Sequence, residues 1–93
     1  MLFLVVHTHI PESCPVENPI AVEKLIDKDH IQKSGLKVLG NYISAPEHTL
    51  FFVLEANDYS QVVRYLRPMM TIGTPRIYPV ETLAKSLGVV KEG

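Results

Sequence analysis

The segment Leu2–His9 limits the possible folds more than any other part of the chain, because it is apolar on both faces of a β-strand. Successive side chains of a strand point to opposite sides of the sheet. One side carries Phe3 and Val5, and the other carries Leu4 and Val6. A strand of this kind is covered on both faces. The pattern therefore predicts a central strand in a sheet whose two faces are both shielded from water.

Three further segments have the composition of strands, and amphipathic helices separate them. The strands are expected at Leu2–His9, Leu36–Ser44, His48–Ala56 and Pro75–Val80. The third strand, like the first, is apolar on both faces. Pro75 and Pro79 bracket the last strand, which favours an edge position because proline cannot donate a hydrogen bond to a neighbouring strand.

Local signals place the first helix between the first two strands. Asn18 is a suitable N-cap, Pro19 suits the first helical position, and Gly35 ends the helix. The polar run Lys28–His30 is expected to interrupt this helix. We also expect His30 to be a solvated surface residue, because its neighbours in sequence are charged.

A second helix follows the third strand. Asp58 is the expected N-cap, and Gln61 is placed for a capping box. Pro68 limits this helix, since proline breaks a helix interior. Its buried stripe is predicted at Tyr59, Val62, Val63 and Leu66. A short terminal helix is expected near Leu83, ended by Gly88.

The order of these elements is β-α-β-β-α-β followed by a short helix, which is the ferredoxin-like arrangement of the α+β class. We expect residues 1–93 to form one such domain. Its sheet is antiparallel with strand order 4-1-3-2, and its helices cover one face only. The other face needs a cover as well, because strands one and three are apolar on both sides. A homodimer that pairs its sheets is the simplest solution.

Charge and composition narrow the functional classes. The net charge is −1 and the charges are scattered, which argues against a nucleic-acid partner. No apolar run approaches the ~20 residues of a membrane span. The short N-terminal apolar run lacks the preceding basic residue of a signal peptide. The single cysteine, Cys14, excludes an intramolecular disulfide. These features together lead us to expect a soluble cytoplasmic protein.

Three segments carry a family resemblance: Gly35–Gly40, Phe51–Ala56 with Asp58, and Ile77–Val80. In them the chain resembles the dimeric α/β-barrel superfamily, and most closely one of its uncharacterised families. Muconolactone isomerases and cofactor-free monooxygenases belong to the same superfamily. The resemblance implies a ferredoxin-like domain that pairs its sheet with that of a second copy. It transfers no catalytic residue, because the enzymes of the superfamily differ in theirs.

Chemically versatile side chains gather at one end of the predicted sheet. His7 and His9 are two residues apart on the first strand, so they share one face with Cα atoms roughly 6.6 Å apart. Strand three runs antiparallel beside strand one and brings His48 to the same end, and Cys14 lies in the adjoining loop. Imidazoles and a thiol are suitable ligands for Zn²⁺, Cu²⁺ or Fe²⁺. We predict a transition-metal site at His7, His9, His48 and Cys14.

Two other functions fit the same residues. In a metal-free enzyme, such as an isomerase or a monooxygenase, a histidine would act as general acid or base near neutral pH. In a non-catalytic sensor or oligomerisation domain, the histidines would bind an ion or small ligand without turnover. The side chains expected to orient a small-molecule ligand are Asn41, Tyr42, Arg76 and Tyr78.

Overall fold

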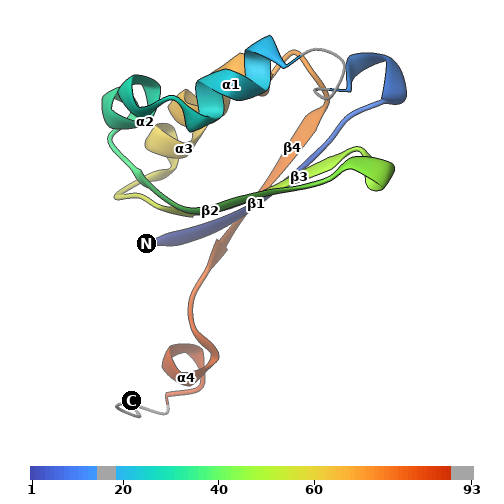
Figure 1. Cartoon of the computed structure of the whole chain (residues 1–93). Helices are drawn as coiled ribbons and strands as arrows, with labels where there is room; N and C mark the ends of the chain where they lie inside the picture. Colours follow the sequence, from blue (N-terminus) through green and yellow to red (C-terminus); the bar gives the residue numbers. More distant parts are fainter. Residues whose placement is uncertain (15–18, 89–93) are drawn as a thin grey trace.

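The computed structural model describes residues 1–14 and 19–88 and shows an α+β fold (Figure 1). The strands are β1 (Leu2–Thr8), β2 (Lys37–Ser44), β3 (Thr49–Glu55) and β4 (Thr74–Val80). The helices are α1 (Ile20–Ile26), α2 (Lys28–Ser34), α3 (Tyr59–Leu66) and α4 (Leu83–Ser86). Short 3-10 turns η1 (Pro11–Ser13), η2 (Ala45–Glu47) and η3 (Arg67–Met69) join them. The predicted order of elements is confirmed.

The four strands form one antiparallel sheet in the order β2-β3-β1-β4. This is the predicted order 4-1-3-2 read from the other edge, with β1 central and β4 at an edge. Helices α1, α2 and α3 lie together on one face of the sheet, whereas α4 lies away from them beyond the end of β4 (Figure 1). The ferredoxin-like fold class is therefore confirmed, including the short C-terminal helix.

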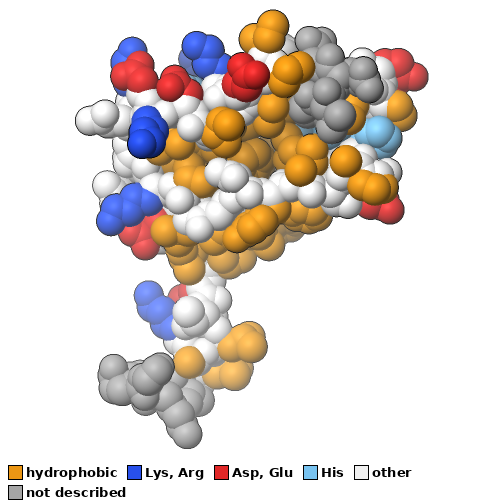
Figure 2. Space-filling model, in the orientation of Figure 1, with side chains coloured by type: hydrophobic (Ala, Val, Ile, Leu, Met, Phe, Trp, Pro, Cys, Tyr) orange, Lys and Arg blue, Asp and Glu red, His pale blue; other side chains and the backbone are white. Residues whose placement is uncertain are grey.

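The hydrophobic core lies between the sheet and helices α1 to α3. Phe3 and Val5 of β1 are buried there, next to Phe52 and Leu54 of β3. On the opposite face of the sheet Leu4 remains 36% exposed. Hydrophobic side chains extend along the underside of the sheet (Figure 2). Cross-strand pairing assigns to this open face Leu2, Leu4, Val6, Tyr42, Phe51, Val53, Arg76, Tyr78 and Val80.

The first helical region is split, as its sequence predicts. The break lies at Asp27, whose backbone is extended (ψ 123°), one residue before the run expected to cause it. Gly35 ends α2 in the left-handed conformation with φ 79°, which glycine adopts without steric cost. Helix α1 begins directly after Pro19, and the predicted cap Asn18 lies outside the described residues.

Helix α3 has the predicted cap but a different buried stripe. The backbone N–H of Gln61 donates to Asp58 Oδ1 at 3.1 Å, and the Gln61 side chain accepts from the N–H of Asn57. The buried residues are Val62, Tyr65 and Leu66. Tyr59 is 57% exposed, so its predicted burial is wrong. Tyr59 is the first residue of α3, and the buried part of the helix begins at Val62, nearly one turn later.

His30 is not the solvated residue that its charged neighbours indicate. It is half-buried, and its Nε2 donates to the backbone oxygen of Tyr65 at 2.8 Å. The two rings stack with centroids 5.7 Å apart. Because the hydrogen bond satisfies the imidazole, His30 can join α2 to α3 at little cost of desolvation.

Candidate functional site

His7 and His9 lie on the helix-covered side of the sheet, as the alternation of β1 predicts. Both are buried. His9 follows the last residue of β1, and its backbone N–H donates to the carbonyl oxygen of His48 at 3.1 Å. This bond continues the pairing of β1 with β3 by one step. His9 and His48 are therefore directly opposite each other at one end of the sheet.

His48 occupies an unusual backbone conformation at the turn between β2 and β3. Its φ is 51° and its ψ is 45°, the left-handed region that few non-glycine residues adopt. Its N–H closes η2 by donating to Ala45 O at 3.1 Å. In this conformation the ring lies edge-on to His9, with centroids 5.5 Å apart. The antiparallel topology thus brings these two imidazoles together.

Cys14 joins the two histidines from the loop that leaves β1. The η1 turn folds this loop back, with the Cys14 N–H donating to Pro11 O at 3.2 Å, and buries the thiol. The ligand atoms of His9, Cys14 and His48 all lie within 4.8 Å of one another. Two imidazole nitrogens and one sulfur at this spacing could hold a single metal ion.

His7 adjoins this group of three but lies outside it. Its ring centroid is 6.0 Å from that of His9. Its Nε2 donates to the backbone oxygen of Met69 in η3 at 3.0 Å, which fixes the ring against the helical layer. Its Nδ1 is buried and has no hydrogen-bond partner among the described residues.

The polar atoms of this cluster are poorly satisfied. Both ring nitrogens of His9 and Nδ1 of His48 are buried without a hydrogen-bond partner in the described part of the chain. Such groups are rare in folded proteins, since each costs about 1–3 kcal/mol of desolvation. Burial lowers the pKa of His9 below its ordinary value, and the adjacent His7 and His48 lower it further. At neutral pH His9 is therefore an uncharged imidazole, the form that binds a metal or accepts a proton.

Gly73 is a structural part of the site that the sequence pattern did not reveal. Its φ is 83°, and a Cβ at this position would collide with the backbone oxygen of Thr8. It would also lie 2.9 Å from both His7 Cε1 and His9 Cβ. The loop before β4 therefore packs directly on the His7–His9 segment, and only glycine permits this approach.

The four residues expected to orient a ligand do not share one pocket. Asn41 and Tyr42 line a pocket of about 210 Å³ between α1 and β2. Arg76 pairs with Val6 and Tyr78 pairs with Leu4, which places both on the open face of the sheet. Tyr42 pairs with Phe51 and shares the open face with these two, whereas Asn41 pairs with buried Phe52 on the helix-covered side. The predicted set is therefore divided between the two faces of the sheet.

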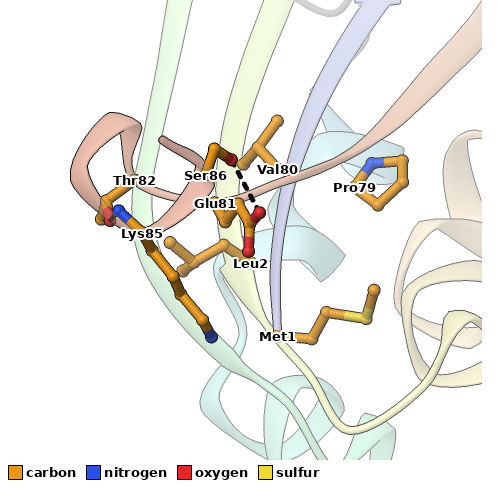
Figure 3. Close-up of a pocket in the computed structure, with 8 residues that line it drawn as sticks. All are labelled: Met1, Leu2, Pro79, Val80, Glu81, Thr82, Lys85 and Ser86. Atoms are coloured by element: carbon orange, nitrogen blue, oxygen red, sulfur yellow. Dashed lines mark hydrogen bonds between the residues drawn. The ribbon is translucent and has the colours of Figure 1, made fainter. Parts of the chain in front are cut away.

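A larger opening of about 980 Å³ lies between α4 and the body of the domain (Figure 3). Met1, Leu2 and Pro79 line one side, and Lys85 and Ser86 of α4 line the other. Within the arm that carries α4, Ser86 Oγ donates to Glu81 Oε1 at 2.7 Å. The lining residues carry none of the histidines or the cysteine, so this opening is separate from the cluster described above.

The fold and the cluster define a small α+β domain with a three-residue group suited to a metal ion. A family model for a domain of unknown function, DUF3303, matches residues 1–93, and the chain belongs to this uncharacterised family. No curated protein matches the chain. No helix among the described residues is long and apolar enough to cross a membrane.

Proposed function

We propose that this domain binds one transition-metal ion through His9, Cys14 and His48. The observation that carries the proposal is the convergence of these three ligand atoms within 4.8 Å, in a place where His9 leaves both ring nitrogens without a partner. Coordination would satisfy nitrogens that otherwise cost folding free energy. Three protein ligands would leave a further position for water or a substrate.

The ligand types favour borderline metals over hard ones. Imidazole suits Zn²⁺, Cu²⁺ and Fe²⁺, a thiolate adds preference for zinc and copper, and no carboxylate belongs to the group. His7 is the nearest candidate for a fourth ligand, through Nδ1, because its Nε2 already donates to Met69. The neutral state of His9 at pH 7 would support binding without competition from a proton.

Elemental analysis of protein purified without a histidine tag tests this proposal. We expect close to one ion of zinc, copper or iron per chain, and loss of most of it in Cys14→Ser and His48→Asn. Asparagine tolerates the left-handed backbone of His48, so the second variant should still fold. The matched control is His30→Gln, which changes a histidine of α2 that neither belongs to the group of three ligands nor adjoins it, and which should retain the metal.

A cobalt-loaded sample provides an independent measurement. Wild-type protein is expected to show the near-ultraviolet charge-transfer band of a thiolate–cobalt bond, and Cys14→Ser is expected to lack it. Metal far below one equivalent with no uptake on reconstitution would overturn the proposal. That result would favour a second candidate function, a metal-free enzyme in which His9 acts as a general base. The lowered pKa of His9 supports this role, because it leaves the imidazole unprotonated near neutral pH.

We propose in addition that the domain forms a homodimer through the open face of its sheet, as in the dimeric α/β-barrel superfamily. The apolar side chains Leu4, Val6 and Phe51 support this, because helices α1 to α3 cover only the other face (Figures 1 and 2). The histidine cluster lies on the helix-covered side, so each subunit would contain a complete site.

A further inference from the structure

The pocket between α1 and the edge strand β2 reaches from the surface into the core. Its rim is formed by exposed Ile26, Tyr42 and Ile43. Its floor is formed by Leu25, Leu50 and Phe52, which are at most 3% exposed. Hydrophobic side chains surround the hollow between the helical layer and the front edge of the sheet (Figure 2).

The lining chemistry defines which ligands the pocket can accept. It is formed by Val22, Leu25, Ile26, Asn41, Tyr42, Ile43, Leu50 and Phe52. None of these described residues is charged, and the polar side chain that faces the helical layer is that of Asn41, because Tyr42 pairs with Phe51 and its hydroxyl lies beside Gly40 on the open face. A charged ligand would lose hydration here without gaining a counter-charge. For an apolar ligand the loss of hydration is itself favourable.

The size of the pocket supports a small molecule as the occupant. A dry cavity of about 150 Å³ lined by aliphatic and aromatic side chains is large enough to bind benzene. The present pocket, at about 210 Å³, has room for a substituted ring or a branched chain of similar size. Small-molecule sites are typically apolar hollows with few polar groups. The proposed dimer uses the other face of the sheet and leaves this hollow free.

We propose that this pocket binds a small, uncharged aromatic or branched aliphatic molecule, with the amide of Asn41 available to one polar substituent. The site does not depend on a metal. It does adjoin the histidine cluster, because Ile43, Leu50 and His7 pair in one row across β2, β3 and β1. Leu50 therefore separates the pocket from His7 by a single side chain.

Titration with toluene, followed in ¹⁵N–¹H correlation spectra, tests the proposal. We expect saturable shifts at backbone amides of α1 and β2 around the pocket. Val22→Phe fills the hollow and should weaken toluene binding about ten-fold or more. The matched control is Ile20→Phe, the same enlargement on the same helix at a residue outside the pocket lining, and it should bind toluene as wild type does.

Val22→Ala keeps the proposal testable if the phenylalanine variant does not fold. It enlarges the hollow, and we expect it to bind the larger probe naphthalene more tightly than wild type does. Absence of saturable shifts in wild-type protein would overturn the proposal. It would equally be overturned if Val22→Phe, but not Ile20→Phe, changed the sedimentation coefficient, because a second copy of the chain would then occupy the pocket.

Discussion

At the scale of single residues, the histidine cluster depends on backbone geometry as much as on its side chains. His48 holds a left-handed conformation, and Gly73 packs against the backbone of Thr8 and the rings beside it. A residue in a sparsely populated backbone region costs about 1–3 kcal/mol, and such residues gather at functional sites. His48 is such a residue, and it lies beside ring nitrogens that have no hydrogen-bond partner among the described residues, which supports the view that this end of the sheet is the functional one.

Gly73→Ala should both destabilise the domain and disrupt the cluster. We expect a loss of about 2–4 kcal/mol in the free energy of unfolding, from left-handed strain plus the collision with Thr8. Denaturant unfolding measures this, and metal content reports the effect on the site. Gly35→Ala is the control, since its φ of 79° is similar but its Cβ meets only the flexible end of Gln61. Equal losses in the two variants, with metal retained in both, would contradict the role assigned to Gly73.

The cluster could be predicted from sequence only in part. The alternation in β1 placed His7 and His9 on one face, and antiparallel pairing brought His48 to the same end. The η1 turn that returns Cys14 has no strong sequence signal. The role of Gly73 could not be predicted from local sequence, because the groups that it contacts are more than 60 residues away in the chain. Long-range packing of this kind has no periodicity to reveal it.

At the scale of elements, the strands were easier to predict than the faces of the helices. Apolar runs, prolines and capping residues predict where a strand or helix begins and ends, because their effects depend on residues close by in the sequence. The buried stripe of α3 instead follows from where α1 and α2 pack. The hydroxyl of Tyr65 donates to Leu25 O at 2.6 Å, and Nε2 of His30 donates to Tyr65 O. These hydrogen bonds offset the cost of removing the two polar side chains from water. The first contact joins α3 to α1 and the second joins α3 to α2, the two helices that the break at Asp27 separates.

The N-cap of α3 should make stability depend on pH. Hydrogen bonds from Ser60 and from the N–H of Gln61 hold the pKa of Asp58 below its ordinary value. The folded state therefore binds this proton less readily than the unfolded state, so the stabilisation is present above the ordinary pKa and is lost as pH falls through the folded one. Asp58→Ala is expected to lower Tm at pH 7 by roughly 3–8 °C.

Asp58→Asn separates the cap from its charge. Asparagine also caps helices, so this variant should retain most of the stability at pH 7. Melting curves between pH 7 and pH 3 would show whether the difference between wild type and Asp58→Asn shrinks on acidification. A difference that stays constant across this range would mean that ionisation of Asp58 does not stabilise α3.

At the scale of the whole molecule, the uncovered face of the sheet is the main unsatisfied feature. Its centre is Leu4 on β1, flanked by Val53 on β3 and Tyr78 on β4. The arm that carries α4 extends from the sheet on the side opposite the other helices (Figure 1), and Leu83 and Leu87 in this arm are exposed. The homodimer that we propose would cover this apolar surface.

Sedimentation of the wild-type protein should therefore give twice the 10.4 kDa mass of the chain at micromolar concentration. Leu4→Lys would place a charge at the centre of the interface, and we expect the dimer dissociation constant to rise about 100-fold or more. Ile20→Lys is the control, because it adds the same charge to an exposed apolar residue on the helical side. A monomeric wild type would refute sheet pairing, whereas a dimer that tolerates Leu4→Lys but not Ile20→Lys would move the interface to the helices.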